Sequence, residues 1–212
     1  MISKACRLNL IAVTGEPLWV LGRSFNTFLC VALGLFVRKI YLLVMLLLVV
    51  SCTGVPPGVT PVQQFSLPNY LGTWYEIARL DHSFERGLTE VTANYSLRDD
   101  GGVRVLNRGY DAEEGAWQDA EGKAYFVDEP TVGRLKVSFF GPFYGAYNIA
   151  RLSPDYSMAL VVGPDLSYGW ILARSANPSA EMLKSFQQTA TELGITLDSW
   201  IIVAHGNNTK GN

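Results

Sequence analysis

Residues Leu71–Arg79 read LGTWYEIAR, and they open the part of the 212-residue chain that has a β pattern. From this stretch onward, short strand-like runs alternate with tight-turn sequences rich in Asp, Gly and Pro, such as Asp99–Gly102 and Gly163–Asp165. The predicted strands are Thr73–Leu80, Glu90–Leu97, Val103–Tyr110, Ala116–Val127, Arg134–Phe140, Tyr144–Leu152, Ser157–Val162 and Tyr168–Arg174.

One helix and one final strand complete the pattern. Apolar residues at helical spacing predict a helix over Ala180–Leu193, with a cap-like start at Ser179 and a stop at Gly194. A short strand, Trp200–Ala204, follows. No helix of 10–15 residues separates any pair of the eight strands, which excludes a parallel βαβ sheet. We therefore predict an all-β fold, an eight-stranded antiparallel up-and-down barrel that leaves no open edge, with one C-terminal α-helix and a short last strand.

Strand alternation places charged side chains outside the barrel and apolar side chains inside it. Eight strands enclose either a packed core or one small ligand, and the small residues Ala78, Ala93 and Ala124 favour a cavity. The candidate ligand wall is Ala78, Ala93, Tyr95, Val105, Asn107, Ala124, Leu135, Val137, Phe139, Tyr147, Ile149, Trp170 and Leu172. Asn107 would bond a ligand head group or satisfy a buried backbone group.

The segment Leu80–Leu88 is predicted to form the mouth of the barrel. It contains Asp81, His82, Glu85 and Arg86. Arg86 is either a partner for an anionic head group or a solvated loop cation. An apolar tube with a polar mouth suits a fatty acyl chain.

Composition removes several classes of function. The formal net charge is -2, and no stripe of Lys and Arg is present to grip nucleic-acid phosphates. The chain has only 2 His and 3 Cys, too few for a His-rich or Cys-rich metal site or a disulfide framework. We expect no metal and no cofactor.

The segment before the barrel has the pattern of a targeting signal. Arg38 and Lys39 precede the eleven apolar residues Ile40–Val50, a run too short for a stable bilayer span and typical of a signal-peptide core. Ser51–Cys52 follows and resembles the lipobox of bacterial lipoproteins, in which the Cys is acylated after cleavage. The alternative is a signal peptide with an incidental Cys.

These features divide the chain into four parts. Residues 1–51 are the expected signal segment, and residues 1–36 fit it poorly, which indicates either a translation start further along or a true membrane helix. Residues 52–65 are predicted to be the lipidated Cys52 with a flexible tether, residues 66–206 the barrel, and residues 207–212 a flexible tail.

Three motifs carry a resemblance to a known family. Gly72-Thr73-Trp74 on the first strand looks like the G-x-W signature of the lipocalins, and Asp155-Tyr156 matches the turn between their sixth and seventh strands. Arg174 stands where the family has an Arg that packs on the signature Trp, a cation–π contact. The resemblance implies that Trp74 and Arg174 close one end of the barrel and that Gly72, Asp155 and Tyr156 complete the structural signature. Pro154 replaces a commoner Thr, which puts one local hydrogen bond of that turn in doubt.

Longer stretches resemble the bacterial outer-membrane lipocalins, relatives of apolipoprotein D. They are Leu71–Arg79, Phe84–Gly87 and Lys136–Phe143. The resemblance implies an outer-membrane lipoprotein that faces the periplasm, binds a fatty acid or lysophospholipid, and serves membrane maintenance under stress. Thr53 after the Cys, in place of Asp, agrees with outer-membrane sorting. Whether the protein forms a homodimer is left open.

Two other functional classes stay open at this point. A structural lipoprotein would have a filled barrel and a protein partner. An enzyme would need reactive groups, and Asp81-His82-Ser83 has the three residue types of a hydrolase triad, although adjacent residues cannot easily face one another in that geometry. His205 in the C-terminal segment is expected to be solvated.

Overall fold

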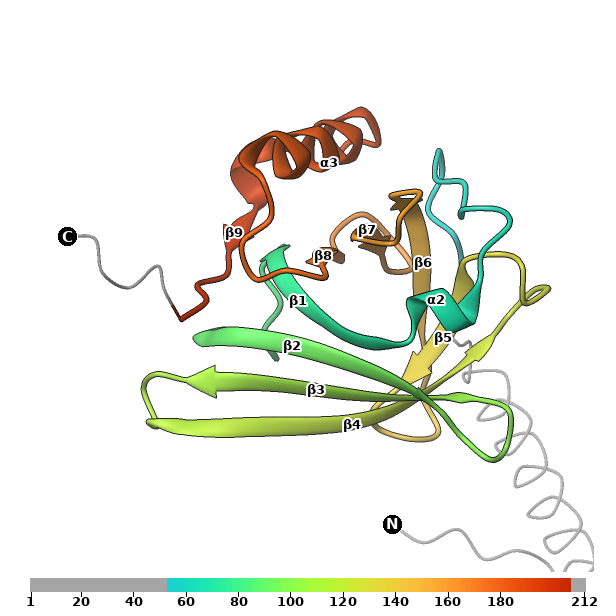
Figure 1. Ribbon diagram of the computed structural model, residues 1–212, viewed down its shortest axis with the longest axis horizontal. Coiled ribbons are helices and arrows are strands. Elements are labelled where there is room, and N and C mark those ends of the chain that lie inside the picture. Colours follow the sequence, from blue (N-terminus) through green and yellow to red (C-terminus); the bar gives the residue numbers. More distant parts are fainter. Residues whose placement is uncertain (1–52, 207–212) are drawn as a thin grey trace, which may run out of the picture. The chain divides into compact units, whose positions relative to one another are not determined.

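The computed structural model describes residues 53–206, which form a closed antiparallel barrel (Figure 1). The eight barrel strands are β1 (Gly72–Arg79), β2 (Leu88–Leu97), β3 (Val103–Asp111), β4 (Ala116–Phe126), β5 (Arg134–Ser138), β6 (Gly145–Leu152), β7 (Met158–Val162) and β8 (Gly169–Ala173). Each strand pairs with the next, and β1 pairs with both β2 and β8, which closes the barrel. The predicted fold class is confirmed, and each strand boundary lies within two residues of its prediction.

Three short elements and one longer helix lie outside the barrel strands. The helix α2 (Leu67–Tyr70) precedes β1, and the helix α3 (Ala180–Glu192) follows β8. Ser179 caps α3 by accepting a hydrogen bond from the Met182 backbone N–H. A 3₁₀ turn, η1 (Leu197–Ser199), leads to β9 (Ile201–Ile202), which pairs with the end of β1 outside the barrel. None of the helices in residues 53–206 has the length and apolar character needed to cross a bilayer.

The connections of the meander alternate between two ends of the barrel. The loops β1–β2, β3–β4, β5–β6 and β7–β8 lie at one end, which we call the open end. The turns β2–β3, β4–β5 and β6–β7 lie at the other end with α2, which we call the closed end. Figure 1 shows β2, β3 and β4 side by side, extending to the open end.

Two apolar clusters hold the molecule together. The inner cluster fills the barrel around Trp74, Tyr95 and Leu135. The outer cluster lies between the barrel wall and α3, and Phe186 and Ala190 are its buried helix residues. Because both clusters lie within residues 53–206, this part of the chain carries a complete core of its own.

Residues 53–66 form a strap along the barrel wall and not the predicted free tether. The Val62 backbone N–H donates to Ile149 O at 2.9 Å, and the Phe65 N–H donates to Thr131 O at 2.8 Å. Val59 is buried in the outer cluster. The prediction of a flexible segment was wrong. The Pro and Gly residues of this segment form turns, and its apolar side chains pack against the barrel wall.

Candidate lipid site in the barrel

The signature residues pack together at the closed end. The guanidinium of Arg174 lies 4.0 Å from the ring centre of Trp74, and it donates to the backbone oxygens of Thr73, Asn69 and Leu71, each at 2.8 Å. Trp74 is fully buried, and its indole N–H donates to Tyr70 O at 2.8 Å. These contacts close the barrel floor.

Asp155 and Tyr156 also serve the closed end. Asp155 Oδ1 accepts from the backbone N–H and the hydroxyl of Ser157, at 3.1 and 2.7 Å. Tyr156 adopts a left-handed φ of 57°, and its hydroxyl accepts from the Ser66 N–H at 2.8 Å. Ser153 Oγ accepts from the N–H groups of Ser157 and Met158, each at 2.9 Å, so a hydroxyl beside Pro154 supplies hydrogen bonds to the turn.

Three tyrosine side chains contact one another inside the barrel near its closed end. The Tyr147 hydroxyl lies 2.7 Å from that of Tyr70 and 2.8 Å from that of Tyr95. Burial raises the pKa of all three phenols above the ordinary value, so the hydroxyls stay protonated at neutral pH. Two of the predicted wall residues, Tyr95 and Tyr147, thus bond each other inside the barrel.

Most of the predicted wall faces the barrel interior. The inner cluster contains Ala93, Tyr95, Val105, Ala124, Leu135, Ile149 and Leu172, with Val137, Phe139, Tyr147 and Trp170 packed against it. Asn107 pairs in register with Ala93 and with Ala120, which places it on the same inner face. Its Oδ1 is buried and has no hydrogen-bond partner among the described residues.

Ala78 is the exception. It pairs with Ile171 and belongs to the outer cluster, on the helix-facing side of the wall. The register of β1 shifts between Glu76 and Ala78, so the alternation changes face there. Its assignment to the ligand wall was wrong for this reason.

Two charged residues of β1 face inward: Glu76 by the ordinary alternation from Trp74, and Arg79 because of the same shift. Glu76 pairs with Leu172 and Arg79 pairs with Trp170, so both side chains face the interior, and both are buried. Sequence reasoning missed them because it assigned charges to the outer face. The signal that could have found Glu76 is its position two residues after Trp74, on the same face of the strand.

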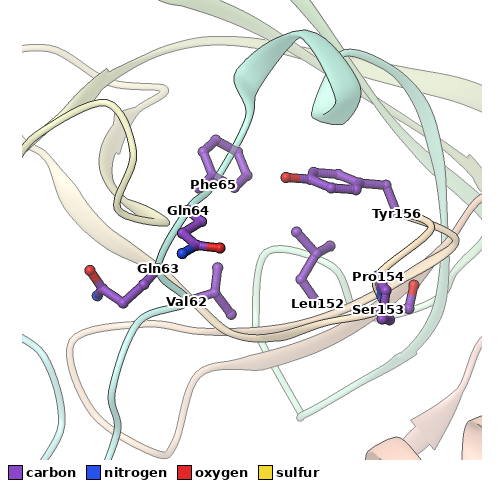
Figure 2. A pocket seen from close by; sticks show the side chains of 8 residues that line it. All are labelled: Val62, Gln63, Gln64, Phe65, Leu152, Ser153, Pro154 and Tyr156. Atoms are coloured by element: carbon purple, nitrogen blue, oxygen red, sulfur yellow. The ribbon is translucent and has the colours of Figure 1, made fainter.

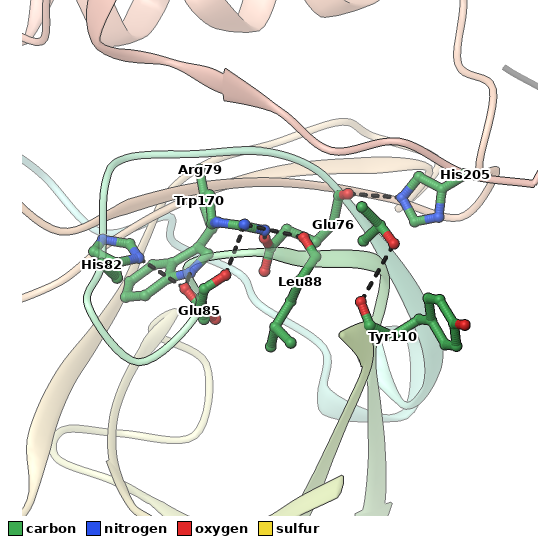
Figure 3. Close-up of polar contacts among 9 residues, drawn as sticks. Glu76, Arg79, His82, Glu85, Leu88, Tyr110, Trp170 and His205 are labelled. Atoms are coloured by element: carbon green, nitrogen blue, oxygen red, sulfur yellow. Dashed lines mark hydrogen bonds and ion pairs between the residues drawn. The ribbon is translucent and has the colours of Figure 1, made fainter. Parts of the chain in front are cut away.

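These charges belong to what we call the mouth cluster, which consists of Glu76, Arg79, His82, Glu85 and Trp170 (Figure 3). Arg79 donates to Glu76 Oε1 at 2.8 Å and to the Glu85 backbone oxygen at 2.7 Å. His82 Nδ1 lies 2.8 Å from Glu85 Oε2, and the Trp170 indole N–H donates to the same oxygen at 3.1 Å. The cluster therefore fastens the β1–β2 loop to strands β1 and β8 across the open end.

The burial of Glu76 has an electrostatic consequence. Desolvation and the neighbouring Glu85 carboxylate raise the pKa of Glu76 to about 8, although the hydrogen bond from Arg79 opposes the shift. Glu76 is thus largely protonated at neutral pH. Within the cluster the Arg79 guanidinium lies 2.8 Å from the Glu76 carboxyl, and the Glu85 carboxyl lies 2.8 Å from His82 Nδ1.

Other predicted mouth residues have different roles. Arg86 forms a bidentate ion pair with Asp81, with both hydrogen bonds at 2.7 Å, and both side chains are more than half exposed. Since Asp81 pairs with Arg86 and His82 pairs with Glu85, Asp81-His82-Ser83 does not form a relay. His205 is buried, with Nε2 2.8 Å from Glu76 O, and the expectation that it is solvated was wrong because β9 brings it against β1.

The inner face opens to solvent toward the open end. Ala124 is buried on this face, whereas Ala120 and Gln118, further along the same face of β4, are exposed. By contrast, a separate pocket of about 440 Å³ lies at the closed end between the strap and the β6–β7 turn, lined by Val62, Gln63, Gln64, Phe65, Leu152, Ser153, Pro154 and Tyr156 (Figure 2). The described residues hold no group of three metal-ligating side chains.

Comparison with known proteins agrees with this geometry. A family model described as a lipocalin-like domain matches residues 65–205. The chain belongs to the lipocalin family. It is 52% identical over 167 residues to the outer membrane lipoprotein Blc of Vibrio cholerae, covering 78% of this chain and 98% of that protein. It is 54% identical over 158 residues to the protein of the same name in Escherichia coli, covering 74% and 89%.

The lipocalin fold also matches a solved structure. Insecticyanin from the tobacco hornworm Manduca sexta superposes with a TM-score of 0.59 at 21% identity, covering 73% of this chain and 88% of that one. At this identity the likeness supports the fold alone. The family match thus bears out the resemblance that the G-x-W, D-Y and Arg174 motifs indicated.

Proposed function

We propose that this lipocalin is an outer-membrane lipoprotein, anchored by acylation of Cys52, that carries or stores a fatty acid or lysophospholipid with its barrel in the periplasm. The names of the Blc relatives support the localisation. Residue Cys52 itself lies outside the described residues. Its lipobox-like setting supports the anchor, and membrane maintenance under stress is the role that this placement serves.

One observation carries the ligand-binding part of the proposal. The inner face of β4 passes from the buried Ala124 to the exposed Ala120, so the apolar interior is continuous with an exposed inner face at the open end. An acyl chain placed there gains about 0.8 kcal/mol for each CH₂ removed from water, before ordering is subtracted. Asn107 Oδ1 is an acceptor on the same face that a ligand hydroxyl or ammonium can reach.

The mouth cluster supplies the polar end of the site. The ionisable side chains of this cluster already have partners within the protein. Arg79 donates to Glu76, and Glu85 lies against His82. A zwitterionic or weakly charged head group suits such a mouth better than a strongly anionic one. This favours a lysophospholipid over a free fatty acid as cargo.

The test is native mass spectrometry of the chain 53–212, followed by extraction and identification of bound lipid. We expect one lipid per barrel. The matched variants are Ala120→Phe, which adds a ring to the exposed part of the inner face, and Asp119→Phe, which places the same ring on the outer face. Ala120→Phe should lower uptake of a fluorescent acyl lipid several-fold, while Asp119→Phe should leave it unchanged. An empty barrel that takes up no lipid contradicts the carrier function and favours a structural lipoprotein.

Acylation is tested separately on the full chain. The intact mass of the membrane-bound protein should correspond to a chain that begins at acylated Cys52. The Cys52→Ala variant should lose the acyl mass and leave the membrane fraction.

A further inference from the structure

The β5–β6 loop carries two aromatic side chains that the barrel does not cover. Phe140 is 82% exposed and Phe143 is 70% exposed. Burying a phenylalanine side chain is favourable by about 1.5–3 kcal/mol, so covering the two exposed rings of this loop would lower the free energy further. Exposed apolar groups gathered in this way mark an interaction surface.

The described chain begins on the same hairpin. Arg134, the first residue of β5, donates from Nη2 to Thr53 O at 3.1 Å. Asn148 of β6 donates from Nδ2 to Gly54 O at 3.1 Å. The peptide bond joins Thr53 directly to Cys52, so an acyl anchor on that Cys has no slack chain between it and the β5–β6 hairpin. Arg134 and Asn148 pair with each other at the end of the hairpin away from the β5–β6 loop, so the anchor meets the hairpin about 20 Å from Phe140. A barrel that lies with this hairpin along the bilayer brings both the anchor and the loop to the membrane.

The outer face of the hairpin has the charge that a phospholipid surface attracts. Leu135 and Val137 face inward, so Arg134 and Lys136 lie on the outer face of β5. Arg134 is paired with Asp128 at 2.9 Å, so Lys136 is the basic side chain of this face that can meet a head group. The Lys136 ammonium lies 5.1 Å from the ring centre of Tyr144. Basic side chains attract anionic head groups, and aromatic rings settle at the level of the head groups.

We propose that the β5–β6 hairpin is a membrane-docking surface, with Phe140 and Phe143 inserted into the phospholipid bilayer to which Cys52 is anchored. This inference rests on the anchoring part of the proposed function. The β5–β6 loop belongs to the open end, so docking turns the barrel mouth toward the bilayer. A lipid then passes between the membrane and the barrel without crossing open water.

The test replaces the acyl anchor with a chemical one. The chain 53–212 carries an N-terminal hexahistidine tag and is held on vesicles of phosphatidylethanolamine and phosphatidylglycerol with brominated acyl chains and a nickel-chelating lipid. The variants are Phe143→Trp and the control Leu97→Trp, since Leu97 is 64% exposed at the closed end. Bromine quenches only an indole that enters the bilayer.

We expect the new indole at position 143 to be quenched at least about twofold more strongly than the one at position 97, after subtraction of the unsubstituted chain. Adding Lys136→Glu should reduce this quenching on phosphatidylglycerol vesicles. Equal quenching at the two positions, or none at position 143, overturns the proposal. If quenching is absent and sedimentation shows that Phe140→Ser with Phe143→Ser converts a dimer to a monomer, the loops bind a second copy instead.

Failure of this proposal is distinguishable from failure of the proposed function. The tag makes the quenching independent of acylation, which the intact mass measures. Lipid uptake by the Ala120→Phe and Asp119→Phe pair tests the cargo without any vesicle. A chain that is acylated and binds lipid, and yet shows no quenching at position 143, refutes docking alone.

Discussion

The two ends of the barrel are built on different physical chemistry. At the closed end, the Arg174 guanidinium covers the ring of Trp74 and donates hydrogen bonds to nearby backbone oxygens. At the open end, the side chains of Glu76, Arg79 and Glu85 are buried together and hold a loop in place. The comparison teaches that packing seals one end, whereas at the other end a buried polar network, which a proton or a ligand can change, fastens a loop beside the opening.

Removing the ring at the closed end is expected to give the largest effect. Trp74→Ala leaves a cavity in the inner cluster and frees the Arg174 guanidinium from its ring, and it should lower the free energy of unfolding by about 5 kcal/mol. Urea unfolding followed by circular dichroism measures this change. A loss near 1 kcal/mol would show that the floor is not packed around this residue.

The open end is tested by removing its buried cation. Arg79→Met removes the ion-pair partner of Glu76 and leaves the backbone oxygens of Glu85 and Leu88 without a donor, so we expect a loss of about 3 kcal/mol. The control is Arg86→Met in the exposed pair with Asp81, where the loss should stay below about 1 kcal/mol. Equal losses would mean that the mouth cluster contributes no more than a surface ion pair.

The pH dependence of stability separates the two ends further. Because the pKa of Glu76 is about 8 in the folded protein and near 4.5 in the unfolded chain, the folded state holds this proton more tightly. Stability from this group is full below about pH 4.5 and is lost as the pH rises through about 8. Glu76→Gln should flatten most of that decline between pH 5 and pH 9. Thermal unfolding from pH 5 to pH 9 measures it, and an unchanged slope contradicts the assignment.

A smaller effect is expected at the β6–β7 turn of the closed end. Ser153→Ala removes the hydroxyl that accepts from the Ser157 and Met158 N–H groups, and it should reduce stability by about 1 kcal/mol. Hydrogen exchange of the two amides should rise in parallel. If neither quantity changes, another group supplies the turn with its acceptor.

The closed end could be predicted from the sequence because its chemistry is local or motif-borne. Trp74 and Arg174 are predicted to close the barrel, and the structure brings Arg174 onto Trp74. The strand boundaries also followed from alternation and turn residues, since both act over a few neighbouring positions. Most of the predicted ligand wall faces inward for the same reason.

The open end could not be predicted in the same way. A register shift in β1 places Ala78 outside and Arg79 inside, and no single-strand pattern signals such a shift. Glu76 follows the alternation from Trp74, but a charged residue was not expected inside. His205 is buried by pairing between segments 129 residues apart, and the strap is bound by contacts to β5 and β6. The sequence by itself determined the barrel, its closing motif and its greasy interior, because alternation and turn chemistry depend on near neighbours. Only the tertiary structure decided which ionisable side chains are buried at the mouth and how the strap lies on the barrel wall. Both depend on residues that meet only after the barrel closes.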